Sequence, residues 1–362
     1  MHPAASWVKG RGALDQGAAA RFVSSFAKWP RGTAPLALLL AATSLASAAT
    51  DPALARLEQQ VEYVSHATDG VAGVGATHIE TGRTLSLRGF EGFPMASAFK
   101  LPVAVQILSL VDDGRLTLDK MVPLAPSDLH PGSGELTEFF FHPGVSLSIA
   151  NLMELMLTIS DNTAADLLLR EAGGPAAVTA RMRALGLTGI RVDRSTAVLI
   201  SDWQGVKNLP PESQWNRELW DKLFDAVPQS DHMRARRAEM ADPRDTATPD
   251  DMTKLLLRVW KRDILTPESA RVLLDIMDRC QTGKSRIKGL LPQGTDVAHK
   301  TGTLGGVAND IGFITLPGNA GHVAISIFTK ASNKPEEASE KAIAEISRTI
   351  YDYFVLVPGN DR

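Results

Sequence analysis

Apolar residues follow a strand pattern near both ends of the chain and a helical pattern between them. Residues 54–64 have helical spacing of their apolar positions, and two β-rich runs, 71–79 and 84–88, flank a short polar turn that contains Gly82. Strand texture returns near the C-terminus at residues 297–300, 309–316 and 322–329. Because a two-stranded hairpin is marginally stable alone, we expect the strands of both ends to share one antiparallel sheet.

The middle of the chain contains long apolar segments that predict helices. Gly114 and Gly186 stand where two of these helices would stop, and Ser146 or Ser148 stands near the start of a third. The predicted helices are residues 101–110, 147–159, 176–185 and 250–260, followed by a closing helix at 335–353. The pattern therefore predicts an α+β fold: a five-stranded antiparallel sheet built from both chain ends with flanking helices, plus an all-helical lobe. A cleft between two lobes is a usual place for a functional site.

The same pattern predicts how the chain is divided. One domain spans residues 51–358, with an α/β lobe made of 51–92 and 290–358 and a helical lobe at 93–289. We find no internal repeat that would indicate an array of smaller units.

The first 48 residues differ from the rest. Five basic residues stand against a single acid, Asp15, and an apolar stretch follows at 34–45. Residues 46–48 (Ala-Ser-Ala) then have the small-residue pattern of a cleavage site. This order predicts a signal peptide over 1–48, which would direct the protein to a bacterial periplasm or the cell exterior. The alternative is a disordered tail with a short buried helix.

Composition excludes several classes of protein. The chain has 362 residues and is 44% hydrophobic, so a sizeable core is possible. Its 38 Lys and Arg residues are balanced by 41 Asp and Glu, whereas a nucleic-acid-binding protein is expected to have a basic excess. Cys280 is the only cysteine in the sequence, which excludes an intrachain disulfide, and it is predicted to be a buried core thiol. The histidines lack metal-ligand spacing and no apolar run approaches the roughly 20 residues of a membrane span, so we predict no metal, no cofactor and no span.

Three short motifs appear in order along the chain. They are Ser97-Ala98-Phe99-Lys100, Ser160-Asp161-Asn162 and Lys300-Thr301-Gly302. A serine hydroxyl is a weak nucleophile until a base takes its proton, and a lysine three residues further along a helix faces the same side. Lys100 can therefore be the base for Ser97 if it is neutral, a state favoured by burial and by Lys300 nearby. Free backbone N–H groups at a helix start can bind an oxyanion.

The other two motifs supply groups that a substrate would contact. Ser160 can pass a proton to a leaving nitrogen, and Asn162 can hold a substrate amide. Lys300 offers a cation for a substrate carboxylate. The residues expected to bind substrate beside it are Asn162, Thr301, Gly302 and Thr303.

With these motifs the sequence resembles the class A serine β-lactamase family over about residues 54–355. Segments 155–169 and 281–292 resemble the family's central helix and the segment that leads into its K-T-G strand. His299 and Asp166 resemble residues of the family's more divergent branch. The resemblance implies the family's fold and an enzyme that opens β-lactam rings without a cofactor.

The resemblance also implies individual roles. Ser97 would be the acylated nucleophile, and Lys100 and Ser160 would carry protons. The N–H groups of Ser97 and Thr303 would form the oxyanion hole. Arg286 stands where some members place an arginine that helps to hold the substrate carboxylate; the alternative is an ordinary surface charge.

The omega loop carries both an agreement and a departure. By resemblance, Arg194 and Asp245 form the salt bridge that closes this loop. Family members carry a glutamate two residues after that arginine, where it activates the deacylating water, and an asparagine four residues later. Here these positions hold Thr196 and Ile200, and a threonine hydroxyl cannot act as a general base near neutral pH.

The loop is also longer than the family's ordinary loop, with an insertion at about 199–242. Its tryptophans, Trp203, Trp215 and Trp220, are predicted to pack the insertion onto the body. A catalytic role for one of its acids, Asp202, Glu212 or Glu218, is the open alternative to a missing base.

Three hypotheses about function follow. The first is an exported, monomeric serine hydrolase that opens β-lactams through an acyl-Ser97 intermediate and deacylates slowly. The second is a penicillin-binding D,D-peptidase or esterase that acylates with little turnover. The third is a non-catalytic binder of muropeptides or β-lactams, against which the paired Ser97 and Lys100 argue, because a binder needs no base beside a serine.

Overall fold

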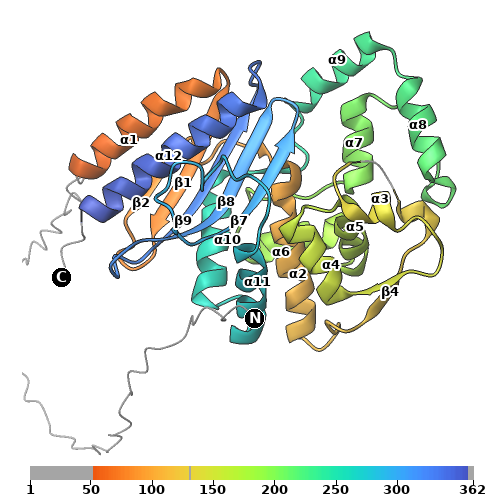
Figure 1. Cartoon of the computed structure of the whole chain (residues 1–362), viewed down its shortest axis with the longest axis horizontal. Coiled ribbons are helices and arrows are strands. Elements are labelled where there is room, and N and C mark those ends of the chain that lie inside the picture. The colour runs from red at the N-terminus through yellow and green to blue at the C-terminus, as the bar shows by residue number, and fades with distance from the viewer. Residues whose placement is uncertain (1–51, 130–131, 358–362) are drawn as a thin grey trace, which may run out of the picture. The chain divides into compact units, whose positions relative to one another are not determined.

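The computed structural model describes residues 52–129 and 132–357 and has an α+β fold (Figure 1). The predicted signal peptide at 1–48 lies outside the described residues. The main sheet contains β1 (Val71–His78), β2 (Thr84–Leu87), β7 (Val297–Leu304), β8 (Val307–Thr315) and β9 (His322–Lys330).

The sheet joins the two ends of the chain, as the sequence predicts. Its strand order is β2-β1-β9-β8-β7, and every neighbouring pair is antiparallel. β1 pairs with β9 in a register that places Val74 opposite Ile327 and Ala76 opposite Ile325. All four side chains are fully buried, so a shift of one residue would expose this apolar set and the register is strongly specified.

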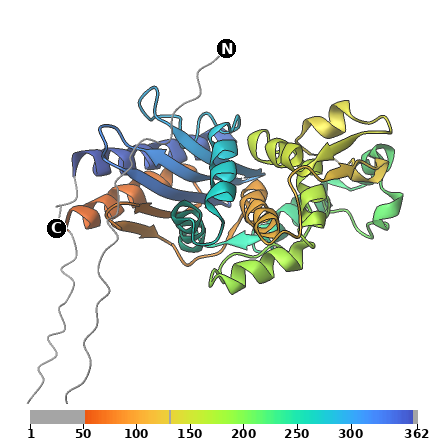
Figure 2. The same ribbon diagram turned by 90° about the horizontal axis from the view of Figure 1, so that it is seen from below.

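Helices cover both faces of the sheet. α1 (Pro52–Ser65) and α12 (Glu336–Leu356) lie side by side on one face (Figure 1) and bury Val61 and Ile350 against it. α10 (Pro249–Lys261) packs against β1 and β9 on the other face (Figures 1 and 2).

The helical region is built around α2 (Lys100–Asp112), most of whose side chains are buried. Its other long helices are α4 (Ile149–Thr158), α5 (Asn162–Glu171), α6 (Pro175–Ala184) and α11 (Pro267–Asp278). The shorter elements are η1 (His66–Thr68), β3 (Phe93–Pro94), η2 (Ala96–Phe99), β4 (Met121–Pro123), η3 (Pro126–Asp128), α3 (Glu135–Phe139), β5 (Ser146–Ser148) and β6 (Thr246–Ala247). No helix in the described parts of the chain is long and apolar enough to cross a membrane.

Several predicted elements have slightly different bounds, and two of the differences concern the motifs or the helix before one of them. The helix expected at 147–159 begins at Ile149, because Ser146–Ser148 instead forms strand β5 and pairs with β4. Ser148 is the cap of this helix, since its side chain accepts a hydrogen bond from the backbone N–H of Asn151. The strand expected at 297–300 continues to Leu304, so the K-T-G motif lies within a strand rather than at its end.

The insertion forms a small layer of its own. It contains α7 (Thr196–Gln204), η4 (Glu212–Gln214), α8 (Arg217–Asp225) and α9 (Gln229–Glu239). Trp215 and Trp220 are buried, with ring centroids 5.1 Å apart, and pack on Ala197 of α7. These two tryptophans therefore pack helices of this segment against one another, while their predicted packing onto the body of the protein stays a prediction.

Candidate active site

Ser97 lies on the short turn η2, immediately before α2, and β7 runs against this turn. Gly302 makes the close approach possible, because a Cβ there would lie 2.4 Å from the carbonyl oxygen of Met95 and 2.9 Å from the backbone nitrogen of Ala98. The buried Asn309 side chain donates hydrogen bonds of 2.9 Å to the carbonyls of both Pro94 and Met95. Asn309 thereby fixes the turn that carries Ser97, although no sequence motif marks it.

Ser97 opens into a cavity of about 400 Å³ between the helical region and the end of β7. Polar side chains in its lining include Asn162, Thr196 and Thr303. Apolar side chains form a large part of the remaining wall, namely Phe99, Leu199, Ile200, Trp203, Phe224 and Leu304. Among the described residues that line this cavity, none has a carboxylate or an imidazole.

Both motif lysines are fully buried and meet at the hydroxyl of Ser160. Lys100 Nζ donates hydrogen bonds to Ser160 O (2.6 Å), Asn162 Oδ1 (2.8 Å) and Ser160 Oγ (3.2 Å). Lys300 Nζ donates to Ser160 Oγ (3.0 Å) and to Thr301 O (2.7 Å). The structure therefore brings together residues from all three motifs.

Burial and mutual repulsion disfavour a positive charge on these lysines. Burial lowers the pKa of Lys100 well below its ordinary value, and the charge of Lys300 lowers it further. The charges of Asp161 and Asp166 act in the opposite direction and raise it. Burial also lowers the pKa of Lys300, to about 8, although the charges of Cys280 and Asp310 raise it. This arrangement favours the neutral form of Lys100 more strongly than exposure to solvent would.

The S-D-N turn is held in place by its central residue. Asp161 Oδ1 accepts a hydrogen bond from Ala164 N (2.8 Å) and thereby caps α5, while its Oδ2 accepts one from Leu136 N (2.9 Å). Ser160 adopts a left-handed backbone conformation with φ of 62°. The backbone N–H of Asn162 donates to Ser133 O (2.8 Å), which ties the turn to the neighbouring loop.

Arg286 is buried, with 3% of its surface exposed, so the surface-charge alternative is wrong. Its guanidinium donates to Gly302 O (3.0 Å) and Thr303 Oγ1 (2.6 Å) on β7. On its other side it forms ion pairs with Glu336 and Glu340 of α12. Arg286 thus holds the Thr303 hydroxyl, while its direct contact with a substrate carboxylate stays a prediction.

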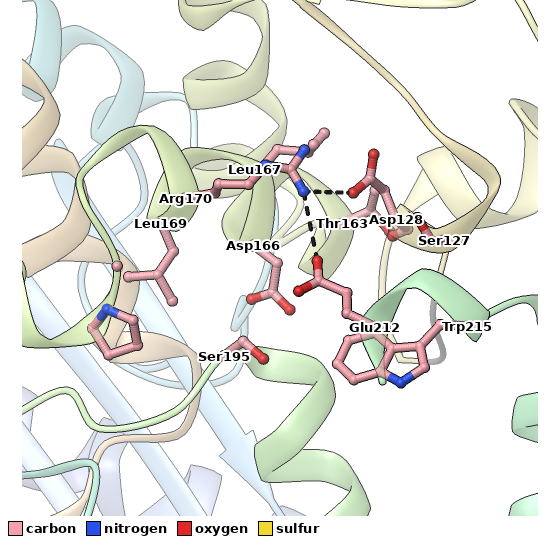
Figure 3. Close-up of a pocket in the computed structure, with 12 residues that line it drawn as sticks. Ser127, Asp128, Thr163, Asp166, Leu167, Leu169, Arg170, Ser195, Glu212 and Trp215 are labelled. Atoms are coloured by element: carbon pink, nitrogen blue, oxygen red, sulfur yellow. Dashed lines mark hydrogen bonds and ion pairs between the residues drawn. The ribbon is translucent and has the colours of Figure 1, made fainter. Parts of the chain in front are cut away.

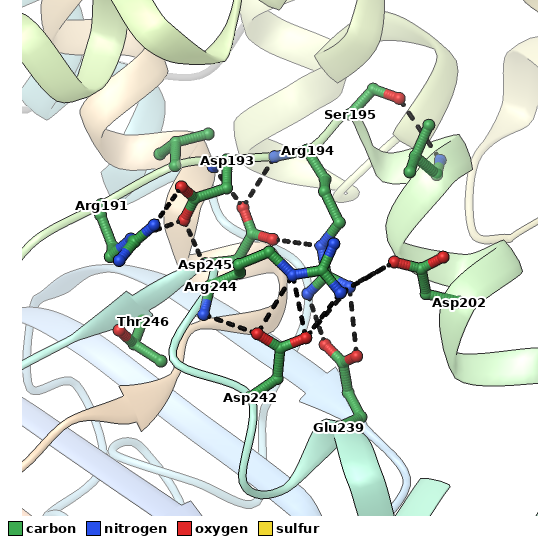
Figure 4. A network of polar contacts seen from close by, with 12 residues as sticks. Arg191, Asp193, Arg194, Ser195, Asp202, Glu239, Asp242, Arg244, Asp245 and Thr246 are labelled. Atoms are coloured by element: carbon green, nitrogen blue, oxygen red, sulfur yellow. Dashed lines mark hydrogen bonds and ion pairs between the residues drawn. The ribbon is translucent and has the colours of Figure 1, made fainter. Parts of the chain in front are cut away.

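Arg194 and Asp245 lie at the base of the insertion, 2.6 Å apart from Nε to Oδ2 (Figure 4). The Arg194 guanidinium also bonds Glu239 (2.6 Å) and Asp202 (2.8 Å). Burial lowers the pKa of Arg194, but its hydrogen bonds to Glu239, Asp245 and Asp202 raise it well above its ordinary value. The network joins both ends of the insertion to one buried cation.

Replacing Arg194 with methionine is expected to lower the free energy of unfolding by about 3–5 kcal/mol, because it leaves buried carboxylates without their partner. Arg191→Met is the matched control: Arg191 pairs with Asp193 at 2.6 Å, but its side chain is 38% exposed, so we expect about 0–1 kcal/mol. Denaturant unfolding of both variants measures the difference. Equal losses would contradict this account of the network.

None of the three candidate acids of the insertion lines the Ser97 cavity. Asp202 is bound by Arg194, and Glu218 is exposed. Glu212 lines a separate pocket of about 220 Å³, where it lies 3.6 Å from Arg170 (Figure 3). The structure therefore gives no support to a replacement base from this set.

Asp166 also lines that second pocket, but its carboxylate holds the start of α7. Its two oxygens accept hydrogen bonds from the backbone N–H groups of Thr196 (2.7 Å) and Ala197 (3.0 Å). Thr196 is thereby fixed at the cavity wall, and its buried hydroxyl has no hydrogen-bond partner among the described residues. Ile200, one turn later on α7, lines the same wall.

Comparisons with known proteins agree with this geometry. The β-lactamase enzyme family matches residues 56–354. The chain is 30% identical to β-lactamase VEB-1 of Pseudomonas aeruginosa over 83% of this chain and 90% of that protein. It is 31% identical to the carbapenem-hydrolyzing β-lactamase KPC of Klebsiella oxytoca over 85% of this chain and 89% of that protein.

Solved structures give the same result. A β-lactamase from Chitinophaga pinensis matches with a TM-score of 0.68 and 28% identity, over 82% of this chain and 98% of that one. An ancestral class A β-lactamase matches with a TM-score of 0.67 and 32% identity, over 82% and 99%. The chain belongs to the class A β-lactamase family.

Proposed function

We propose that this protein is acylated at Ser97 by β-lactams and that the acyl-enzyme is hydrolysed slowly. The observation that carries the proposal is the composition of the Ser97 cavity. Lys100, Ser160 and Lys300 form one hydrogen-bond network, and Ser97 lines a cavity whose wall has no carboxylate or imidazole among the described residues.

Acylation follows from the state of Lys100. A neutral amine has two N–H groups, and these can donate to the two closest acceptors, Ser160 O and Asn162 Oδ1. The nitrogen lone pair is then available for the proton of Ser97 as its oxygen attacks the lactam carbonyl. The carbonyl C–N bond breaks, Ser160 delivers its proton to the leaving nitrogen, and Lys100 passes the proton taken from Ser97 to Ser160. Backbone N–H groups of Ser97 and Thr303 stabilise the oxyanion.

Deacylation requires a base that activates water beside the ester. Thr196 presents a hydroxyl at the wall where the family carries its glutamate, and Ile200 presents a hydrocarbon. General-base assistance contributes about 10²–10⁴-fold to such a step, so its loss leaves a long-lived acyl-enzyme.

The same observation favours the second hypothesis, a penicillin-binding D,D-peptidase or esterase with slow turnover. A pure binder remains the third hypothesis, against which the lowered pKa of Lys100 beside Ser97 argues. We also propose that segment 1–48 directs export of the protein and that the protein is a monomer.

Intact-protein mass spectrometry after addition of a penicillin tests the proposal. We expect a stoichiometric mass increase that persists for many minutes and maps to the peptide containing Ser97. Ser97→Ala should show no increase. An adduct on another residue, or no adduct with no hydrolysis, would contradict acylation at Ser97. Unchanged binding and biological effect in Ser97→Ala would favour the binder.

The charge of Lys300 predicts a pH dependence. Because its pKa is lowered to about 8, the cation that receives a substrate carboxylate is lost as pH rises through that value. Above it, the apparent affinity for a penicillin should fall by up to about tenfold per pH unit, because the charged fraction falls tenfold. A neutral ester substrate without a carboxylate is the control and should retain its affinity. Equal losses for both substrates would contradict the assignment.

A further inference from the structure

A buried polar cluster behind Lys300 takes no part in the mechanism above. Cys280 Sγ lies 3.3 Å from Thr282 Oγ1, which lies 2.6 Å from Thr301 Oγ1. His299 adjoins the thiol from β7, and its Nδ1 bonds the buried Asp310 carboxylate of β8 at 2.8 Å. A hydrogen-bonded chain therefore links the cysteine to the hydroxyl of the K-T-G motif.

His299 supplies an observation independent of the cysteine. Its side chain is fully buried, and its Nε2 has no conventional hydrogen-bond partner among the described residues. The Cys280 thiol is among the groups that raise the pKa of this histidine. The buried imidazole is thus held by Asp310 through Nδ1 and interacts with the neighbouring thiol.

The direction of the chain depends on one proton. Each hydroxyl of Thr282 and Thr301 has a single proton, and either can be the donor in the bond between them. A protonated Cys280 is able to donate to the Thr282 hydroxyl, in which case Thr282 donates to Thr301 and the Thr301 proton is free for a substrate carboxylate. A thiolate instead accepts from Thr282, Thr282 accepts from Thr301, and Thr301 turns a lone pair toward that carboxylate.

We propose that Cys280 is a positioning residue whose thiol proton, relayed through Thr282, orients the Thr301 hydroxyl toward the substrate carboxylate. The proposal rests on the proposed function, because it assumes that Thr301 receives that carboxylate. It makes substrate affinity depend on a side chain that does not line the Ser97 cavity.

The surrounding charges set where the thiol titrates. Burial raises the pKa of Cys280, but the neighbouring His299 imidazole and then the charge of Lys300 lower it to about 7. Burial lowers the pKa of His299, but Asp310 and the thiol raise it to about 9, so the imidazole is charged when the thiol ionises. Arg286 is a further nearby cation, and its charge lowers the pKa of Lys300.

The first experiment compares the pH dependence of penicillin affinity in the acylation step for three proteins. In the native protein we expect the affinity for penicillin to fall roughly tenfold with a midpoint near pH 7. This midpoint lies at a lower pH than the fall caused by Lys300. Cys280→Ser keeps a donor that does not ionise, so the loss near pH 7 should disappear. Thr282→Val keeps the titrating thiol but cuts the chain, so it should also lack this loss and bind more weakly at pH 6.

Thr282→Val separates the relay from simple charge repulsion. If that variant retains the loss near pH 7, the thiolate acts through its charge alone and the relay is wrong. If Cys280→Ser retains the loss, another group titrates and the proposal is also wrong. A cysteine that only packs would change affinity equally at every pH.

The single cysteine of the sequence allows a second, spectroscopic readout. Thiolate absorbance near 240 nm, with Cys280→Ser as the blank, should titrate with a midpoint near pH 7. Because coupling is reciprocal, acylation by a penicillin should raise this midpoint by about one pH unit, and Thr282→Val should abolish the rise. An unchanged midpoint in the acyl-enzyme would overturn the inference. Failure of the proposed function is distinguishable, since no acyl-enzyme would then form at all.

Discussion

Replacement of Lys100 with methionine is expected to slow the acylation of Ser97 by about 10²- to 10⁴-fold, the range that a lost general base produces. Lys100 is fully buried, and its pKa is lowered by burial and by Lys300, so the native amine is poised to accept a proton. Methionine preserves the length and packing of the side chain and removes the amine. Stopped-flow measurement of the acylation rate constant with a chromogenic cephalosporin checks the expectation.

Lys300→Met provides the comparison for this variant. Lys300 is equally buried and shares the Ser160 hydroxyl, but its proposed role is to hold a carboxylate. It should therefore weaken binding more than it slows the acylation rate constant, whereas Lys100→Met should do the reverse. Thermal unfolding of both variants identifies any loss of folding. A folded Lys100→Met protein that acylates within threefold of the native rate would place the base elsewhere.

Replacement of Thr196 with glutamate is expected to accelerate deacylation by about 10²–10⁴-fold. Thr196 lines the Ser97 cavity at the start of α7, and its backbone is fixed by Asp166, so the new carboxylate would project from a held position. A negative charge is also favourable at a helix N-terminus. The Thr196 hydroxyl has no hydrogen-bond partner among the described residues, so this substitution sacrifices no such bond.

Thr196→Gln is the matched control, since glutamine has the shape of glutamate but cannot act as a base. The decay of the acyl-enzyme mass, followed over time, gives the deacylation rate in each protein. The account requires a faster decay in Thr196→Glu alone. Equal decay in both variants would mean that the site lacks more than a base. The double variant Thr196→Glu/Ile200→Asn would then test whether the missing asparagine is also required.

The sheet and the motif residues could be predicted because they depend on local patterns. Alternating apolar residues identified the strands, and the marginal stability of a lone hairpin required the two ends to pair. The bounds were less predictable: pairing between Leu304 and Val307 extends β7 beyond the K-T-G motif, and no apolar alternation marks that extension.

The remaining features arise from tertiary contacts. Asn309 fixes the turn before Ser97 from a distant strand, and Arg286 is buried because two glutamates of α12 lie over it. The sequence predicts Cys280 as a buried core thiol, and it is buried; its polar surroundings depend on β7 and β8, which place His299 beside Asp310.

The most direct test of the central claim is the pre-steady-state reaction with a chromogenic cephalosporin. We predict a burst of about one product per enzyme molecule, followed by a steady state that is slower by at least two orders of magnitude, because in the proposed function Lys100 is the base of acylation and no group is the base of deacylation. Ser97→Ala should show neither phase. Rapid linear turnover without a burst would contradict slow deacylation and show that the site has an effective base for the acyl-enzyme.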